Sequence, residues 1–226
     1  MVDFTGGTWR SLIDGQEVSA IPDSAIAQYN AKELDLNDQD TVLTWTDAAG
    51  SLDATGGDAS FITDGINGNP SVRFDGDLYT TDIQTFSQRL VVIMVLELND
   101  NNSSQRIFNG ADESAANVVI DAQFNDNLHL LFAGNDLEDN QIPPTAPYLL
   151  TIDVNGSNSA IRINGTEVAS GDVGTNDLEG IAFGARNDGT RPVDGDIGII
   201  EPHNGLPSNG LSTREQEIAD MFGIDI

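Results

Sequence analysis

Three acidic residues near the start of the sequence have the spacing of a catalytic carboxylate set. Glu33, Asp35 and Asp38 follow the pattern E-x-D-x-x-D within the stretch ELDLND. Enzymes that hydrolyse glycosidic bonds use two carboxyl groups, which lie about 5–5.5 Å apart when the reaction retains the anomeric configuration. In an extended strand, alternate side chains project from one face and would bring such acids together. The pattern therefore raises glycoside hydrolysis as one hypothesis.

The residues around these acids favour a turn over a strand. The stretch continues as NDQD, and Asn and Asp are depleted in strands but frequent in turns. Asp38 is also one methylene shorter than the glutamate of an E-x-D-x-x-E pattern. We therefore expect Glu33, Asp35 and Asp38 to lie in a solvated acidic loop and to have no catalytic role.

Other catalytic arrangements lack their parts. His129 and His203 are the two histidines. We expect His129 on a strand, where its ring faces solvent or a neighbour that satisfies its hydrogen bonds, and His203 in a turn. The sequence has no cysteine, no G-x-S-x-G elbow, no H-E-x-x-H motif and no Walker loop. The common hydrolase, thiolate-metal and nucleotide chemistries are therefore not expected.

The charge of the chain is the strongest compositional signal. The 226 residues include 37 acids and 9 bases, which gives a formal net charge of −28, and Lys32 is the single lysine. Self-repulsion of this size opposes a compact state in dilute buffer, whereas at ~1 M salt the Debye length falls to ~3 Å. We therefore expect adaptation to molar salt, with a merely acidic extracellular protein as the alternative. The lack of a basic stripe argues against a nucleic acid partner.

Short apolar runs separated by Gly, Asn, Asp and Thr predict many strands and turns. The run LVVIMVLEL at residues 90–98 is continuous enough for a central strand that is buried on both faces. Asn164-Gly165 lies between two alternating runs and predicts a β-hairpin. The elements before residue 211 are therefore expected to be strands.

The C-terminal stretch, residues 211–223, has the pattern of a helix. Ser212 and Glu215 have capping-box spacing, and Gly223 is a stop signal. No stretch approaches the ~20 apolar residues of a membrane span. The sequence thus predicts a β-sandwich with one terminal helix.

The order of these segments resembles that of concanavalin A-like, laminin-G-like jelly-roll domains. The opening IAQYNAKELDL, the strand TVLTWTD and the stretch NGNPSVRFDG are followed by RINGTEVAS, IAFGARNDGTRPVDGDIGII and the closing LSTREQEI. The resemblance implies an all-β, concanavalin A-like jelly-roll β-sandwich with a short C-terminal helix over residues 24–226. The acidic spacing of ELDLND also resembles the signature of jelly-roll glucanases. This fold hosts lectins, adhesion modules, glycosidases and structural domains, so it implies little about function.

Residues 1–23 form a separate segment that we expect to serve assembly or anchoring. Phe4, Trp9, Leu12 and Ile13 lie there among glycines and polar residues, and aromatic side chains commonly anchor interfaces. The segment resembles the openings of short laminin-G-like (LamG) proteins of halophilic archaea and their viruses. That resemblance implies a virion component, such as a capsid decoration, a turret or a tail fibre.

Two kinds of ligand site are compatible with the loop composition. A glycan site needs an aromatic platform beside hydrogen-bonding side chains, and the candidates are Asp75, Tyr79, Asn135 and Asp136, with core packing as the alternative role of Tyr79. Calcium prefers oxygen ligands, and Asp75, Asp77 and Asp136 are its weak candidates in this aspartate-rich chain. Sequons that offer glycosylation sites occur at Asn101, Asn102, Asn155 and Asn164.

Together these observations predict a non-enzymatic structural or adhesion protein on the exterior of a halophilic virion, which binds host surface glycans. The expected partners are further copies of the chain in a homo-oligomer, other virion structural proteins and surface glycans, without nucleic acid or membrane insertion. No cofactor is expected apart from the weak case for Ca²⁺. The opening residues lack the basic and apolar regions of a secretory signal, which favours assembly in the cytoplasm. A free-standing lectin-like module is the alternative, and a glycoside hydrolase ranks third.

Overall fold

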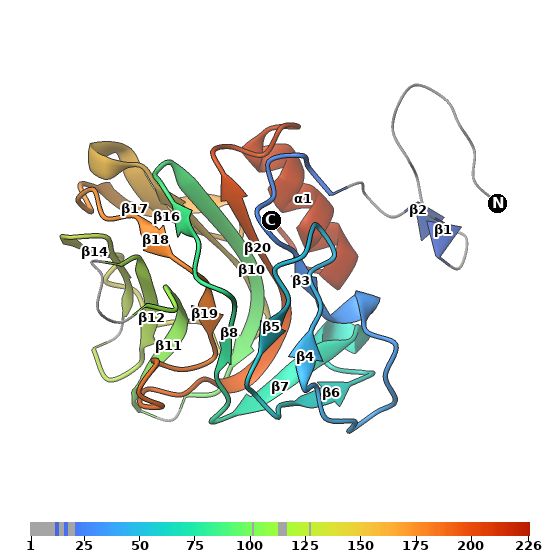
Figure 1. Ribbon diagram of the computed structural model, residues 1–226. Coiled ribbons are helices and arrows are strands. Elements are labelled where there is room, and N and C mark those ends of the chain that lie inside the picture. Colours follow the sequence, from blue (N-terminus) through green and yellow to red (C-terminus); the bar gives the residue numbers. More distant parts are fainter. Residues whose placement is uncertain (1–11, 14–15, 18–20, 101, 113–116, 127) are drawn as a thin grey trace.

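The computed structural model describes residues 12–13, 16–17, 21–100, 102–112, 117–126 and 128–226, and for the first two pairs it describes the backbone alone. These residues form an all-β sandwich with one C-terminal helix, as the sequence predicts (Figure 1). In the first part, β1 (Leu12–Ile13) pairs with β2 (Gln16–Glu17). The described part of the chain contains no helix with the length and apolar character needed to cross a membrane.

Eight strands form the first of two facing sheets. In spatial order it contains β17 (Thr166–Gly171), β16 (Ser159–Ile163), β15 (Tyr148–Val154), β10 (Leu90–Leu98), β20 (Asp194–Asn204), β7 (Ser71–Asp75) and β6 (Ser60–Ile62), with β3 (Tyr29–Asn30) paired to β20. The predicted central strand is confirmed, because β10 lies between β15 and β20 and is buried on both faces. The predicted hairpin is also confirmed: Asn164 and Gly165 join β16 to β17 with the positive φ that a type I′ turn requires.

The second sheet is built from shorter strands. In spatial order it contains β14 (Asp136–Glu138), β13 (Leu128–Phe132), β12 (Val119–Gln123), β11 (Ser104–Asn109), β19 (Ala182–Phe183), β8 (Tyr79–Thr80), β5 (Ala54–Thr55) and β4 (Thr44–Trp45). A further pair joins β9 (Thr85–Phe86) to β18 (Leu178–Glu179), and three 3-10 turns are η1 (Ala31–Glu33), η2 (Ile66–Gly68) and η3 (Gly156–Asn158). Such short strands leave much of the chain in connecting loops.

The space between the sheets holds a cluster of aromatic rings. Tyr29 and Phe74 from the first sheet meet Trp45, Tyr79 and Phe183 from the second, and all five are buried. The centroids of contacting rings are 5.0–6.4 Å apart, mostly in edge-to-face or tilted arrangements. Trp45 and Phe74 are therefore core residues, and this aromatic cluster joins the two sheets.

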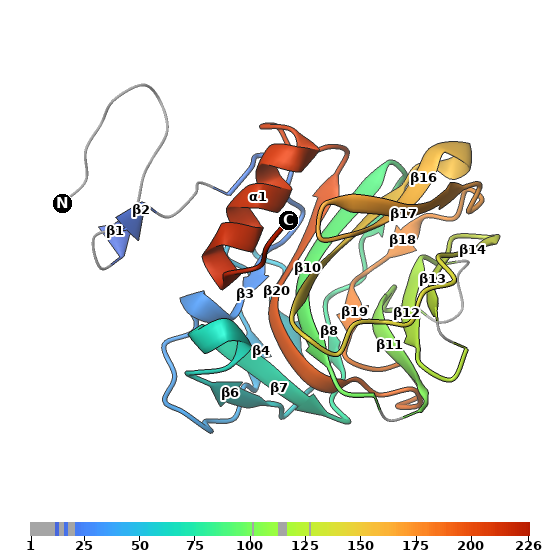
Figure 2. The ribbon, with the colours of Figure 1, turned by 180° about the vertical axis from the view of Figure 1, so that it is seen from behind.

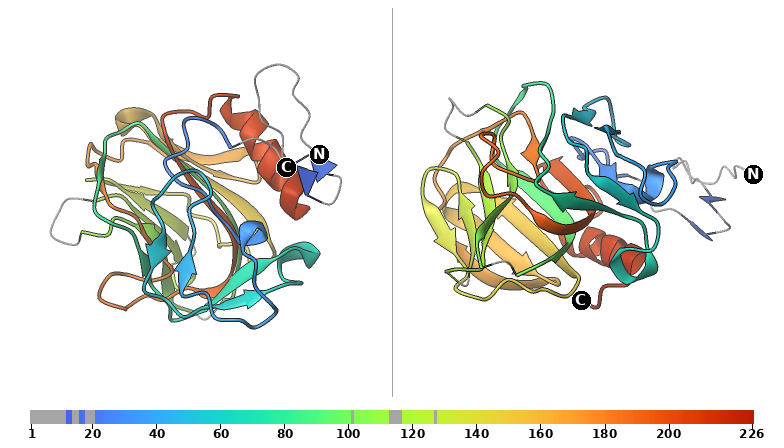
Figure 3. Two further views of the ribbon diagram at one scale, coloured as in Figure 1. Left: turned by 45° about the vertical axis from the view of Figure 1, so that its right-hand side comes forward. Right: turned by 90° about the horizontal axis from the view of Figure 1, so that it is seen from below.

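The helix α1 (Leu211–Phe222) covers the outer face of the first sheet, as Figures 2 and 3 show from further sides. Its buried face contains Ile218, Ala219 and Phe222, which pack against apolar residues of β10, β15 and β20. Gly198 on β20 allows this close approach, because a Cβ there would lie 2.6 Å from the Phe222 ring. The first sheet is therefore buried on both faces where α1 lies.

The two ends of α1 agree with the sequence in part. Gly223 ends the helix in the left-handed conformation, as predicted. The predicted capping box is wrong, because the helix begins at Leu211 and Ser212 lies inside it. Glu215 instead accepts hydrogen bonds from Arg162 of β16 at 2.8 and 3.1 Å. Glu215 therefore forms a tertiary ion pair with Arg162 in place of the local capping interaction that the spacing predicts.

The expected acidic loop is confirmed. Glu33 ends η1, and Asp35 and Asp38 follow it in irregular chain, with all three side chains exposed. Asp38 accepts hydrogen bonds from the backbone N–H and the hydroxyl of Thr63, at 3.1 and 3.3 Å. The three acids therefore do not line one face of a strand.

Both histidines are buried in hydrogen-bond networks. On β13, Nδ1 of His129 lies 2.7 Å from Oδ2 of Asp139, and its Nε2 lies 3.2 Å from the Tyr148 hydroxyl. The prediction of a turn at His203 is wrong, because β20 continues through this residue and stays paired with β10. The turn-like EPHNG sequence is therefore overridden by pairing with a central strand.

Candidate functional site

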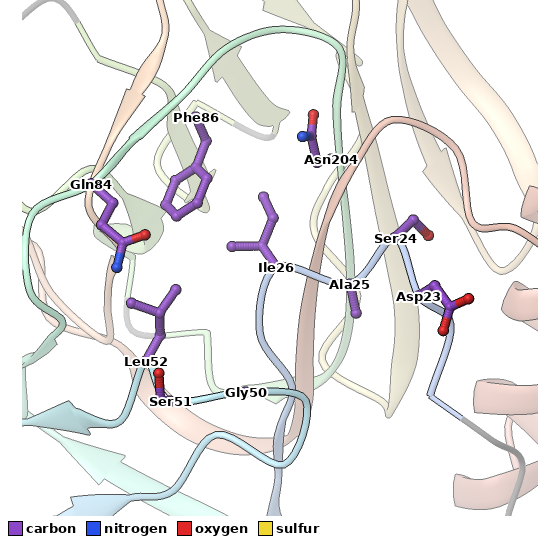
Figure 4. Close-up of a pocket in the computed structure, with 10 residues that line it drawn as sticks. All are labelled: Asp23, Ser24, Ala25, Ile26, Gly50, Ser51, Leu52, Gln84, Phe86 and Asn204. Atoms are coloured by element: carbon purple, nitrogen blue, oxygen red, sulfur yellow. The ribbon is translucent and has the colours of Figure 1, made fainter. Parts of the chain in front are cut away.

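A pocket of about 480 Å³ opens where three loops meet the end of β20 (Figure 4). Small-molecule sites in proteins typically span ~300–1,000 Å³, so this volume suits a small ligand. The ten lining residues come from four separate stretches of the chain: Asp23, Ser24, Ala25, Ile26, Gly50, Ser51, Leu52, Gln84, Phe86 and Asn204.

Three apolar side chains form the floor of the pocket. Ile26, Leu52 and Phe86 are half-buried and pack against the main core. Figure 4 shows that they converge from three different segments. An aromatic ring beside aliphatic side chains offers an apolar surface against which the C–H face of a sugar ring can pack.

The rim of the pocket is polar. Asp23, Ser51, Gln84 and Asn204 are exposed, and their side chains make no hydrogen bond to any other residue that the structure describes. A carboxylate accepts hydrogen bonds, while amides and hydroxyls both donate and accept them. The rim therefore presents unused hydrogen-bonding groups around an apolar floor.

One wall of the pocket is a short extension of the first sheet. The backbone N–H of Asn204 donates to the Ser24 carbonyl at 2.9 Å, and that of Ile26 donates to the Pro202 carbonyl at 2.8 Å. The Ser24 hydroxyl lies 3.1 Å from Nδ1 of the buried His203. These contacts hold the wall formed by residues 24–26 against the end of β20.

A buried charge network supports this wall from behind. Nε2 of His203 lies 2.7 Å from Oε1 of Glu201, and Arg214 of α1 donates to both oxygens of that carboxylate, at 2.7 and 2.5 Å. Burial alone would raise the pKa of Glu201, but hydrogen bonds and charge from Arg214 and His203 outweigh it and lower this pKa from 4.5 to about 2. The charged carboxylate therefore links the pocket wall, β20 and α1.

Asp47 fixes the loop that carries Leu52. Its carboxylate accepts hydrogen bonds from the backbone N–H groups of Gln28, Ala49 and Leu52, at 2.8, 2.8 and 3.0 Å. The Tyr29 hydroxyl donates to the Leu52 carbonyl at 2.6 Å, and burial raises the pKa of Tyr29, so the hydroxyl keeps its proton. Because the loop is ordered in advance, a ligand loses less free energy in fixing it.

The third segment, which carries Gln84 and Phe86, is held by β18. Strand β9 pairs with β18, and the Thr85 hydroxyl donates to Oε2 of Glu179 at 2.7 Å. The backbone N–H of Gly180 donates to the Gln84 carbonyl at 2.7 Å. Each wall of the pocket is thus positioned by contacts that do not involve its ligand-facing groups.

The four residues predicted to bind a glycan do not line this pocket. Tyr79 has its alternative role, core packing, and is not a sugar platform, because it is buried in the aromatic cluster and its hydroxyl donates to the Val42 carbonyl. Asp75 is exposed at the end of β7 in the first sheet, whereas Asn135 and Asp136 are exposed at the start of β14 in the second. The structure therefore separates residues that the sequence suggested as one site.

The three weak calcium candidates do not form one group, because Asp75 and Asp77 are neighbours and Asp136 lies elsewhere. The carboxylate of Asp77 accepts hydrogen bonds from the backbone N–H groups of Asp58 and Asp75, at 3.0 and 3.1 Å, and a side-chain hydrogen bond to Asp77 raises the pKa of Asp58. Asp136 belongs to the other sheet. Among the residues that the structure describes, no three His, Asp or Glu side chains form a group that could hold a metal ion.

The predicted assembly residues are not tested by the structure. Phe4 and Trp9 lie outside the described residues, and of Leu12 and Ile13 only the backbone in β1 is described. Their role in an oligomer interface stays a prediction.

Sequence reasoning missed the residues that form the pocket. Gln84 and Asn204 lie in polar stretches without a motif, and Ile26 and Leu52 are ordinary apolar residues next to turns. One signal was present: Phe86 is a lone aromatic in the polar stretch TTDIQTFSQ, and functional side chains are frequent on loops.

Comparison with known proteins identifies neighbours of the fold. No protein-family model matches the sequence, and no curated protein matches it. Domain 4 of AbnA, a GH43 extracellular arabinanase from Geobacillus stearothermophilus, solved in complex with arabinotriose, superposes with a TM-score of 0.63 at 19% identity, over 85% of this chain and 98% of that domain. Trypanosoma rangeli sialidase in complex with sialic acid gives 0.62 at 11% identity, over 97% of this chain and 37% of the sialidase. A GH54 α-L-arabinofuranosidase variant gives 0.58 at 13% identity, over 77% and 50%.

These neighbours correct one expectation. They are, or are parts of, an arabinanase, a sialidase and an arabinofuranosidase, which are glycoside hydrolases. This finding contradicts the prediction of a non-enzymatic protein, and that prediction is withdrawn. Likeness at these identities establishes the fold alone, which is a β-sandwich found in carbohydrate-active proteins. The more specific assignment to laminin-G-like domains stays a prediction.

Proposed function

We propose that this chain is a carbohydrate-binding β-sandwich whose ligand lies in the pocket between Ile26 and Phe86. The observation that carries the proposal is the combination of an apolar floor with an aromatic ring and a rim of polar side chains without partners among the described residues. Sugars have apolar C–H faces and polar edges, and sites for them use both kinds of contact. The arabinotriose bound to the arabinanase domain supports the proposal, because that domain has a similar fold.

Replacing Phe86 with alanine tests the pocket directly. We expect this variant to bind arabinotriose or another neutral oligosaccharide about 30-fold more weakly, since a central aromatic contact commonly contributes ~2 kcal/mol. Affinity is measured by calorimetric titration after a glycan array has identified the best ligand. The same mixtures, analysed for shorter sugars, show whether binding is followed by cleavage.

Phe132 provides the matched control. It is also a half-buried phenylalanine, on β13 of the second sheet, away from the pocket lining. We expect Phe132→Ala to keep the affinity within about twofold, because it removes no pocket contact. Loss of binding in this variant, with normal binding in the Phe86 variant, would place the ligand elsewhere and contradict the proposed site.

We also propose that the module works at the exterior of a cell or virion of a halophile. Support comes from the net charge of −28 and from the way the few bases are used. Each of the seven arginines that the structure describes pairs with a carboxylate, and the pairs are Arg73–Asp196, Arg89–Asp153, Arg106–Asp121, Arg162–Glu215, Arg186–Asp188, Arg191–Asp121 and Arg214–Glu201. The remaining acids repel one another at low ionic strength.

Salt is therefore expected to stabilise the fold. Raising NaCl from 0.1 to 1 M shortens the Debye length from ~10 to ~3 Å, and we expect the melting temperature to rise by about 5 °C or more. Calorimetry measures this shift, and sucrose at the same osmolality controls for surface exclusion. A melting temperature that sucrose raises as much as NaCl does would remove the electrostatic explanation.

A further inference from the structure

The charge of the pocket lining points to the kind of sugar that it takes. Asp23 is the one ionisable residue among the ten that line the pocket, and the other polar contributors are neutral side chains and backbone groups. Figure 4 shows Asp23 at one end of the pocket and Gln84 at the other. A ligand therefore meets one negative charge and no positive charge in the lining.

Two described basic residues that contact the pocket wall or its neighbour, Arg89 and His203, have other partners. The carbonyl of Arg89 accepts a hydrogen bond from the N–H of Gly205, next to the pocket residue Asn204, but the Arg89 guanidinium forms a two-pronged ion pair with Asp153. His203 lies behind Ser24 with no exposed surface, and both of its ring nitrogens have partners. Neither residue presents a cation to the pocket.

The single lysine is also engaged. Lys32 donates to the Met221 carbonyl at the end of α1 at 3.1 Å and to the Asn69 side chain at the same distance, and its ammonium lies 5.6 Å from the centre of the Phe222 ring. A cation at this end of a helix complements the helix dipole. Within the described residues, every lysine and arginine therefore has a partner.

These observations matter because acidic sugars need a counter-charge. Proteins bind carboxylates through Arg, Lys or clustered N–H groups. Without such a partner, a bound carboxylate loses its hydration and gains no interaction that offsets the desolvation cost. The net charge of −28 adds long-range repulsion toward anions. Neutral sugars meet neither obstacle, and a carboxylate such as Asp23 accepts strong hydrogen bonds from hydroxyl pairs.

We infer that the pocket selects neutral glycans over anionic ones and that Asp23 is the residue that sets this selectivity. The inference rests on the proposed carbohydrate-binding function. The expected ligand is neutral, like the arabinotriose bound to the arabinanase domain, and in this respect it differs from the sialic acid bound to the sialidase.

The test uses oligosaccharides matched except for charge, titrated into the full chain. Probes are arabinotriose, trigalacturonate and the methyl ester of trigalacturonate. At 0.1 M NaCl we expect each neutral probe that binds to have an affinity about tenfold or more above that of trigalacturonate. In 1 M NaCl we expect this difference in affinity to become smaller but to keep its sign. Asp23→Lys is expected to shift the preference toward trigalacturonate by about tenfold or more.

Asp136 supplies the control for net charge. It is exposed on β14 outside the pocket, so Asp136→Lys changes the total charge equally without touching the lining. Equal shifts in the Asp23 and Asp136 variants would overturn the role of Asp23. Stronger binding of trigalacturonate than of its ester by the wild type, lost in Phe86→Ala, would overturn the selectivity while leaving glycan binding intact. Absence of binding by every probe and across the glycan array would instead refute the proposed function, and the inference with it.

Discussion

Replacing Arg214 with alanine is expected to lower the free energy of unfolding by about 3–5 kcal/mol, the usual cost of removing one member of a buried ion pair. Arg214, Glu201 and His203 have no exposed surface, and the guanidinium donates to both oxygens of the Glu201 carboxylate. The variant leaves that carboxylate buried, with His203 and Gln28 as its remaining side-chain partners in the described part of the chain. Urea unfolding at pH 7 in molar salt measures the loss.

Arg186 gives the control for this prediction. Its guanidinium lies 3.6 Å from Asp188, and both side chains are close to half exposed. Such surface pairs contribute about 1 kcal/mol or less, so Arg186→Ala is expected to unfold near the wild-type urea concentration. Equal losses in the two variants would mean that burial does not strengthen the Arg214 pair, and the prediction would fail.

The same pair makes stability depend on acid. The pKa of Glu201 is about 2 in the folded protein and 4.5 ordinarily, so the unfolded chain binds more protons between these values. The stabilising contribution of Glu201 is therefore complete above about pH 4.5 and is lost as the pH falls toward 2. Because Arg214→Ala removes the main cause of the low pKa, we expect its unfolding free energy to fall less steeply over this range than that of the wild type.

The parts of the fold that were predicted correctly depend on local or nearly local signals. A continuous apolar run identified β10, and Asn164-Gly165 identified the hairpin because few residues adopt two successive positive φ values. The errors come from long-range pairing. His203 looked like a turn residue, but β10 supplies a partner for that stretch of β20. Ser212 and Glu215 have the spacing of a capping box, but Glu215 is paired with Arg162 of β16.

The pocket could not be predicted for the same reason. Its floor joins Ile26, Leu52 and Phe86, and no short motif relates these positions. They meet because Asp47 holds one loop, β18 holds another, and the end of β20 holds the third. A single sequence reveals which side chains suit a sugar, but their meeting depends on hydrogen bonds between distant segments.

Tyr79 shows how one residue type can suit two different roles. Its aromatic ring beside Asp75 suggested a sugar platform, with core packing as the alternative. The structure confirms the alternative, because the ring is stacked on Phe183 with centroids 5.6 Å apart and lies edge-on to Trp45 and Phe74. We expect Tyr79→Ala to lower the free energy of unfolding by about 3–5 kcal/mol, as large cavities in aromatic cores do. Urea unfolding measures this loss.

Tyr79→Phe distinguishes a core residue from a ligand contact. The variant keeps the ring but leaves the Val42 carbonyl, which accepts the Tyr79 hydroxyl, without that donor, so we expect a loss of about 1–3 kcal/mol in unfolding free energy. Because the hydroxyl is inside the sandwich, glycan affinity should stay within about twofold of wild type. A variant of wild-type stability with tenfold weaker binding would instead put Tyr79 in the site. Substitutions of the two aromatic residues are thus expected to change different quantities: those of Phe86 lower glycan affinity, and those of Tyr79 lower the free energy of unfolding.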